Sequence, residues 1–328
     1  MSNVLVVAEH RGGELRKVAL EAMSVARSLA DASGGAVHAL LAGPPGIASK
    51  SIQLAAHGAD VVLVAEHPAF ANYNGEALTA LVSERARAGQ YRAVVVSASV
   101  HGRELAPRVA ARLDAGYAAD VVAVSLDGGA VVARHPVNTG KLTATLAIAE
   151  SPAIVSLRPG MFPVIEQPRA GRVETVAPVG DPAASRVVVT AVEQGSRAKL
   201  DLSEAPIIVA GGRGLKTPEN FALAEELAAA FGRAAVGCTR AVSDDGWRPH
   251  SDQIGQTGRV VSPDLYVALG ISGAVQHLAG MRTSRTIVAI NKDREAPIFK
   301  VADYGIVGDA LEIVPALTNA VREARKGH

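Results

Sequence analysis

The sequence predicts an α/β protein with two domains, and three observations point to it. Short runs rich in Val, Ile, Leu and Ala alternate along the chain with segments whose apolar residues recur at helical spacing. These runs are continuously apolar, as in strands buried on both faces of a parallel sheet. A chain of 328 residues is also long enough for two hydrophobic cores. Each domain is therefore expected to be a mostly parallel, Rossmann-like or flavodoxin-like sheet flanked by helices.

The first part of the chain alternates strands and helices in a regular order. Buried strands are expected at four places, Val4–Ala8, Ala36–Leu41, Val61–Val64 and Ala93–Ser97. Amphipathic helices are expected between and after them, at Glu14–Asp31, near Ser49–Ala56, at Glu76–Ala88 and at Arg103–Leu113. This alternation predicts a doubly wound sheet.

The pattern changes after the fourth helix. Strands are expected at Val121–Leu126, Ala130–His135, Lys141–Ile148 and Ala153–Leu157. Turn residues at 127–129 and 138–140 favour antiparallel connections, so these strands are expected to complete the first sheet in antiparallel orientation. One more strand is expected at Arg186–Val192. The polar, glycine-containing stretch Glu193–Asp201 is the expected interdomain linker, with domains at 1–195 and 196–328.

The second domain is expected to begin with the strand Pro206–Ala210. Thr217 and Pro218 suit the N-cap and first position of a helix that runs to Phe231. The strand Ala234–Cys238 and a loop region at 240–258 follow. A final helix is expected from an Asp309 cap to about Arg325.

Composition excludes several classes of function. The 33 Lys and Arg residues nearly balance the 32 Asp and Glu residues, which argues against a nucleic-acid partner. Cys238 is the only cysteine, so we expect no internal disulfide, no metal site, and a core position for this thiol. No apolar run approaches the roughly 20 residues that cross a bilayer, so no membrane insertion is expected. Met1–Asn3 leads directly into a strand, which favours a cytoplasmic protein without a signal peptide.

The stretch Leu265–Asp293 carries the clearest functional signal. Its pattern predicts a buried strand, a sharp Gly270–Gly273 turn, a helix from Ala274, and a second strand at Thr286–Ile290. A turn of this kind before a helix presents free backbone N–H groups that suit a phosphate or another anion. Both glycines also allow the backbone to approach a ligand closely.

Three named motifs fail on spacing. A nucleophile elbow needs glycine where Ala274 stands, and neither a Walker A loop nor G-x-G-x-x-G fits the glycines at 211–217. From spacing, the stretch indicates a phosphate-bearing ligand and no more.

The sequence does, however, resemble the FAD-carrying α subunit of electron-transfer flavoprotein. The resemblance is carried by LYVALGISGAVQHLAGM followed by TIVAINKD within 265–293. Further matching segments are GGRGLK at 211–216, TRAVSDDGW at 239–247, IGQTG at 254–258 and APIFKVADYGIVGD at 296–309. Together they cover nearly all of residues 205–328 in order. The resemblance implies an FAD-binding second domain and a first domain that serves as scaffold and subunit contact.

The resemblance also implies roles for residues around the flavin ring. Thr239 and Arg240 match the pair beside the isoalloxazine, and His277 matches the histidine at its N1/C2 side. Gln256 and Thr257 match residues that reach the flavin edge, in a loop that begins with Ile254 and Gly255. Arg240, His277 and Thr257 are the residues expected to tune the redox potential.

The remaining matches concern the rest of the cofactor. The turn and helix start that hold the ribityl and pyrophosphate groups are matched by Ser272, Gly273, Ala274, Val275 and Gln276. Asn291, Asp309 and Ala310 match the adenosine end, and Arg213 matches a contact toward the phosphates.

The function implied is that of an electron carrier and not an enzyme. With a β subunit, it would pass electrons from flavoprotein dehydrogenases, such as the acyl-CoA dehydrogenases of fatty acid β-oxidation, to a membrane quinone oxidoreductase or another acceptor. Two alternatives stay open. One is a flavin- or nicotinamide-dependent oxidoreductase with its own small substrate, which needs a proton-transfer group that no residue supplies in an evident way. The other is a nucleotide-sensing module, which a colourless protein would favour.

Overall fold

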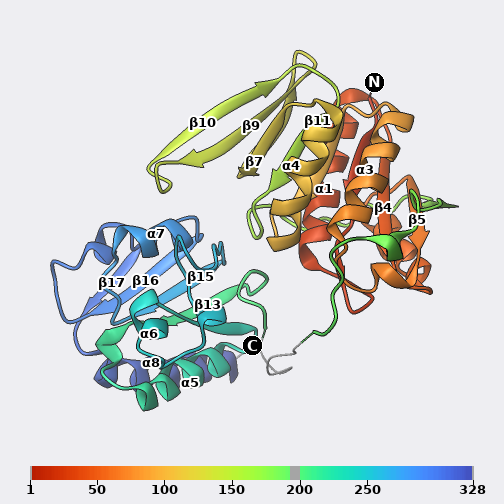
Figure 1. Cartoon of the computed structure of the whole chain (residues 1–328). Coiled ribbons are helices and arrows are strands. Elements are labelled where there is room, and N and C mark those ends of the chain that lie inside the picture. Colours follow the sequence, from red (N-terminus) through yellow and green to blue (C-terminus); the bar gives the residue numbers. More distant parts are fainter. Residues whose placement is uncertain (1, 193–199, 327–328) are drawn as a thin grey trace. The chain divides into compact units, whose positions relative to one another are not determined.

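The computed structural model describes residues 2–192 and 200–326, and the chain divides into two compact units near residue 195 (Figure 1). The predicted linker Glu193–Asp201 lies outside the described residues except for Leu200 and Asp201. Among the described residues, no helix is long and apolar enough to cross a membrane.

The first unit is built on a seven-stranded sheet in the order β12-β5-β4-β1-β6-β11-β7. Every pairing in it is parallel. Its strands are β1 (Val4–Val7), β4 (Val37–Gly43), β5 (Val61–Glu66), β6 (Ala93–Ser97), β7 (Tyr117–Val121), β11 (Ala153–Leu157) and β12 (Arg172–Thr175).

Helices cover both faces of this sheet. They are α1 (Lys17–Ser33), α2 (Ser51–Ala56), α3 (Gly75–Gly89) and α4 (Val100–Leu113). Val4 and Val6 pack with α1 on one face, whereas Leu5 and Val7 pack with α3 and α4 on the other. The side chains of β1 therefore alternate between two cores, and both sets are apolar, which is why the strand reads as a continuous apolar run.

Three expectations for the first unit are wrong, and one strand was not expected. Helix α1 begins at Lys17 and not at Glu14, because β2 (His10–Arg11) and β3 (Glu14–Leu15) pair as a small hairpin. The antiparallel strands do not complete the main sheet. Instead β8 (Ala123–Asp127), β9 (Ala130–Val137) and β10 (Leu142–Ile148) form a separate three-stranded sheet, and β11 is parallel to its neighbours. Residues 186–192 are not a strand; Val187 and Val188 are exposed there. Strand β12 was not foreseen.

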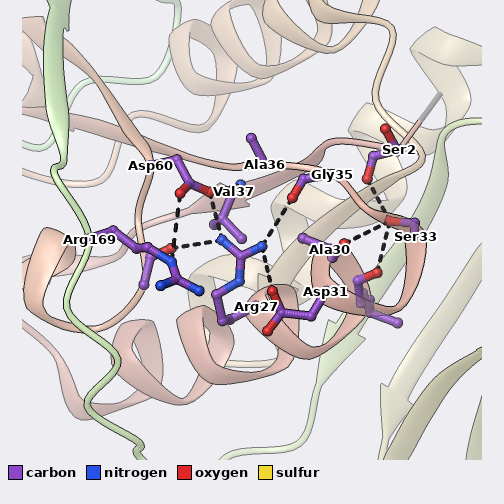
Figure 2. A network of polar contacts seen from close by, with 12 residues as sticks. Ser2, Arg27, Ala30, Asp31, Ser33, Gly35, Ala36, Val37, Asp60 and Arg169 are labelled. Atoms are coloured by element: carbon purple, nitrogen blue, oxygen red, sulfur yellow. Dashed lines mark hydrogen bonds and ion pairs between the residues drawn. The ribbon is translucent and has the colours of Figure 1, made fainter.

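Arg27 connects α1 to the amino-terminal edge of the first sheet by hydrogen bonds and ion pairs (Figure 2). This buried side chain on α1 donates from Nη1 to Asp60 Oδ2 at 2.6 Å, just before β5. Its Nη2 donates to Gly35 O at 3.0 Å, just before β4, and lies 2.8 Å from Asp31 Oδ1 on its own helix. The more exposed Arg169 lies 3.8 Å from Asp60. One guanidinium thus joins a helix end to the starts of two strands.

The second unit has a five-stranded, all-parallel sheet in the order β14-β13-β15-β16-β17. Its strands are β13 (Ile207–Gly211), β14 (Ala234–Cys238), β15 (Leu265–Leu269), β16 (Thr286–Asn291) and β17 (Tyr304–Val307). Helices α5 (Phe221–Phe231) and α8 (Ala310–Lys326) pack on one face. The short α7 (Val275–Met281) and neighbouring loops pack on the other.

Most expectations for the second unit are confirmed. Asp309 caps α8 by accepting a hydrogen bond from the backbone N–H of Leu311, and Cys238 is fully buried. Three details differ. Thr217 precedes a 3₁₀ turn (Pro218–Asn220), and α5 begins only after it. The loop region at 240–258 contains the short helix α6 (Arg240–Asp244), and the strand β17 was not expected. The strand β17 is exposed along its length, so it lacks the apolar pattern of a buried strand.

Candidate functional site

The candidate site lies at the carboxyl-terminal edge of the second sheet. The chain leaves β13 for β14 on one side and returns to β15 on the other, so the strand order reverses between β13 and β15. Ligands of open parallel sheets bind at such a reversal. Five residues predicted for the site lie at the end of, or just after, five different strands at this edge: Arg213, Thr239, Ser272, Asn291 and Asp309. The parallel topology alone brings them to one edge, although they are far apart in sequence.

Glycines let the loops after β13 and β15 meet at the reversal. The N–H of Gly212 donates to Leu269 O at 2.9 Å, and that of Gly214 donates to Gly270 O at 3.1 Å. A Cβ on Gly214 would lie 2.6 Å from the Cα of Gly270. Gly273 has a φ of +84°, and a Cβ there would lie 2.4 Å from the backbone N of Ile298. These glycines are thus needed for backbone-to-backbone packing, in addition to any role near a ligand.

The turn after β15 presents a row of unused backbone donors. Gly273 is buried, but Ser272 and residues 274–276 are exposed. Within residues 2–192 and 200–326, no hydrogen-bond acceptor faces the backbone N–H groups of 272–276. The carbonyl of Ser272 accepts from Ile298 N at 3.0 Å, which fixes the turn. This set of donors at a helix start fits the pyrophosphate of a dinucleotide.

Asn291 and Asp309 are held by contacts within the protein. The Asn291 amide donates to Ile271 O at 2.8 Å and so ties the end of β16 to the turn after β15. Asp309 Oδ2 lies 2.7 Å from Lys292 Nζ and 3.1 Å from Lys216 Nζ. The hydrogen bond from Lys292, that from Leu311 N and the nearby Lys216 lower the pKa of Asp309 below its usual range. The carboxylate therefore stays ionised and can accept hydrogen bonds from hydroxyl groups.

Arg240 projects from the first turn of α6. Its side chain is 67% exposed, and Nε lies 3.2 Å from Asp244 Oδ2 one turn later. Thr239 precedes it, and the Thr239 N–H donates to Gly211 O at 3.1 Å, which holds the start of α6 beside the end of β13. The guanidinium keeps further N–H groups for another partner.

The loop that contains Gln256 and Thr257 packs against α7. Ile254 N donates to Cys238 O at 2.9 Å, and Gln256 N donates to Gln276 O at 2.8 Å. The side chains of Gln256 and Thr257 are exposed, and Thr257 Oγ1 accepts a hydrogen bond from Gln253. The structure therefore brings this loop and the turn after β15 together, as the proposed roles require.

His277 lies in the core at the base of the site. It is only 6% exposed, its Nδ1 lies 3.1 Å from Ile254 O, and its Nε2 lies 3.0 Å from Tyr266 Oη. Because a carbonyl only accepts, Nδ1 carries the hydrogen and Nε2 accepts from the tyrosine. Burial lowers the pKa of His277 to about 4, so the ring is neutral at pH 7. In this arrangement both ring nitrogens already have partners, so a hydrogen bond to a ligand would replace one of them.

Sequence reasoning missed four residues at this site, Lys216, Gln253, Tyr266 and Lys292. Lys216, Tyr266 and Lys292 all lie within matched segments, GGRGLK, LYVALGISGAVQHLAGM and TIVAINKD, so those segments were a usable signal. Gln253 lies outside the matched segments and is identified only by its contacts in the fold. No group of three or more potential metal ligands occurs in the part of the chain that the structure describes.

Comparison with known proteins assigns the family. Residues 4–180 match the family model described as electron transfer flavoprotein domain, and residues 201–282 match the electron transfer flavoprotein FAD-binding domain. The chain is 43% identical to Protein FixB of Clostridium saccharobutylicum, over 98% of this chain and 96% of that one. It is 41% identical to the electron transfer flavoprotein subunit alpha of Bacillus subtilis, over 98% and 97% of the two chains. It is 42% identical to the subunit alpha of Mycobacterium tuberculosis H37Rv, over the full length of both.

The backbone donors of the candidate site, which suit the pyrophosphate of a dinucleotide such as FAD, agree with this comparison. The row of unused donors at 272–276 lies within the segment that matches the FAD-binding domain. The cofactor of this protein is FAD, and the chain belongs to the electron transfer flavoprotein α-subunit family.

Proposed function

We propose that this chain is an electron carrier that binds FAD in its second unit and works with a β subunit. The observation that carries the proposal is the row of free backbone N–H groups at 272–276, on an edge where four other loops meet. When bound, FAD supplies the electron transfer. The protein's part is to bind it, orient it and set its potential.

The pyrophosphate and ribityl groups are assigned to the backbone of Ser272, Gly273, Ala274, Val275 and Gln276, with Arg213 toward the phosphates. These donors face a dianion at a helix start, where the peptide dipoles add to the attraction. The adenosine end is assigned to Asn291, Asp309 and Ala310. Lys216 and Lys292 support this, because they keep the Asp309 carboxylate ionised and fixed as an acceptor for sugar hydroxyls.

The isoalloxazine is assigned to the space beside α6 and the 254–257 loop. Arg240 and Thr239 lie on one segment there, and Ile254, Gly255, Gln256 and Thr257 on the other. Arg240 offers a positive charge that stabilises the electron-rich reduced ring. His277 is neutral, so it contributes as a hydrogen-bonding dipole and not as a charge.

The partners are assigned from the family. Residues 1–195 serve as the scaffold and the contact with the β subunit, and residues 196–328 hold the cofactor. Electrons come from flavoprotein dehydrogenases, such as acyl-CoA dehydrogenases, and go to a membrane quinone oxidoreductase or another acceptor. We propose a cytoplasmic location, without insertion in the membrane.

The experiment is co-expression of the full chain with its β subunit, followed by absorbance and extraction of the cofactor. About one FAD per α chain is expected in addition to any nucleotide of the β subunit. A chain ending at Asp201 is expected to retain none. Retention of stoichiometric FAD by residues 1–201 would contradict the site assignment, and steady turnover of a small substrate without partner proteins would favour an enzyme.

A further inference from the structure

A chain of side-chain hydrogen bonds connects α6 to the loop that carries Thr257. Ser243, on α6, has its Oγ 2.8 Å from Gln253 Oε1. The other end of the same amide, Gln253 Nε2, lies 2.9 Å from Thr257 Oγ1. Gln253 is 1% exposed, whereas Thr257 is exposed at the edge of the candidate site. A buried amide thus links a helix to a hydroxyl that faces outward.

The backbone of Gln253 is fixed on both sides. Its N–H donates to His250 O at 3.1 Å, and its carbonyl accepts from Arg259 N at 2.7 Å. It also forms a parallel bridge with Cys238, at the end of β14. The backbone that carries the amide is therefore fixed, and the contacts with Ser243 and Thr257 orient the amide itself.

The direction of the hydrogen bonds follows from the donors that are present. The single hydrogen of the Ser243 hydroxyl is shared between Gln253 Oε1 and Arg240 O, which lies 2.9 Å away. With its oxygen facing this donor, the amide presents an N–H to Thr257. The Thr257 oxygen accepts there, so its own hydrogen is free for another partner. No acceptor for that hydrogen occurs among residues 2–192 and 200–326.

We propose that Gln253 is a positioning residue that makes the Thr257 hydroxyl a hydrogen-bond donor toward the flavin. The proposal rests on the FAD site proposed above and concerns the polarity of one contact in it. A hydroxyl that also accepts a hydrogen bond is more polarised and is therefore a stronger donor. Hydrogen bonds donated to a flavin stabilise the reduced ring more than the oxidised ring, because the reduced ring carries more negative charge. Gln253 therefore raises the reduction potential through Thr257.

The test is a double-mutant cycle on the FAD-loaded heterodimer, with the first reduction potential as the readout. Gln253→Met keeps the volume of the side chain and removes the amide. The equilibrium constant for one-electron reduction is expected to fall about five-fold, which is about 40 mV. Thr257→Val is expected to lower it further, and adding Gln253→Met to Thr257→Val is expected to change nothing more, since the amide acts only through the hydroxyl.

Two further variants keep the test decisive. Ser243→Ala removes the group that orients the amide and leaves the core intact, so a smaller fall is expected, which also disappears in the Thr257→Val background. Thr318→Val removes a buried hydroxyl of α8 that donates to Val314 O at 2.8 Å, so it should lower stability without moving the potential.

Three results would overturn the proposal: an unchanged potential in Gln253→Met with FAD bound, a fall that persists in full in Thr257→Val, or a rise. A rise would mean that the amide accepts from Thr257 instead of donating to it. A wild-type heterodimer without FAD would instead contradict the proposed function itself, so the two failures are distinguishable.

Discussion

Removing the guanidinium of Arg27 should selectively destabilise the first unit. In Arg27→Met the apolar part of the side chain still covers Gly58, whose Cβ position lies 3.3 Å from Arg27 Cδ. What is lost is the link from α1 to the starts of β4 and β5, through Gly35 O at 3.0 Å and Asp60 Oδ2 at 2.6 Å.

The magnitude follows from how exposed each partner is. Arg27 is 5% exposed, whereas Asp60 is 31% and Asp31 is 51% exposed, so both carboxylates regain water when the arginine is removed. Each of these ion pairs is worth about 0.5–1 kcal/mol after that discount. Gly35 O, which is half-buried, loses its donor, and this costs about 1–2 kcal/mol. We therefore expect Arg27→Met to lower the free energy of unfolding by about 3 kcal/mol, and Arg27→Lys by about half as much.

The assay uses the single tryptophan. Trp247 belongs to the second unit, so its fluorescence follows unfolding there, whereas far-UV circular dichroism follows both units. In urea, Arg27→Met should move the first unit's part of the dichroism transition by about 1.5 M for a slope near 2 kcal/mol/M. The Trp247 transition should stay in place.

Arg169→Met is the matched control. Its guanidinium lies 3.8 Å from the same Asp60 but is 43% exposed, so its removal should cost less than about 0.5 kcal/mol. A loss below about 1 kcal/mol in Arg27→Met, or an equal loss in Arg169→Met, would refute the reasoning from burial.

The other predictions concern the second unit. Burial lowers the pKa of His277 to about 4, so below about pH 6.5 the unfolded chain binds a proton that the native protein does not. The contribution of His277 to the free energy of unfolding is therefore complete above about pH 6.5 and is lost as pH falls toward 4. The free energy of unfolding of the second unit, followed by Trp247 fluorescence, should drop over that range by on the order of 3 kcal/mol. A His277→Gln variant with the same drop would argue against this origin. Gly273→Ala should reduce FAD retention, because the new Cβ would lie 2.4 Å from a backbone nitrogen. Gly128→Ala, at φ +53° with no atom within 4 Å, should lower the free energy of unfolding by about 1 kcal/mol and keep FAD. Equal FAD retention in the two variants would refute the packing argument. Arg240→Ala should lower the first reduction potential of bound FAD by on the order of 90 mV, which corresponds to about 2 kcal/mol of charge stabilisation. Asp244→Asn should raise this potential slightly. Dye-coupled photoreduction measures both, and unchanged potentials would contradict the role given to Arg240.

The sequence by itself determined the fold class and indicated the segments of the candidate site. The apolar runs at 4–7, 93–97 and 265–269 predict buried parallel strands, because both faces of such strands must be apolar. The Gly270–Gly273 turn predicted a loop whose backbone donors suit an anion, because backbone donors and positive φ are local properties. Family resemblance supplied the cofactor, which spacing alone left open.

The tertiary structure decided what depends on contacts between distant residues. Lys216 and Asp309 are 93 positions apart and meet only because β13 and β17 end at the same edge. The antiparallel strands β8–β10 were visible in the sequence, but their separation into a second sheet was not, since hydrogen-bonding partners are a property of the whole fold.

His277 shows the same limit at the level of one side chain. Its position was predicted, but its neutral state follows from burial and from hydrogen bonds to Tyr266 and to Ile254, 23 positions earlier. Gln253 lies outside the matched IGQTG segment, and a role for its amide is indicated only by the contacts of its two ends with Ser243 and Thr257. Local patterns specify which residues form strands, helices and turns, because those depend on neighbours in sequence. Electrostatic environment and hydrogen-bond direction depend on neighbours in space, so only the folded arrangement decided them.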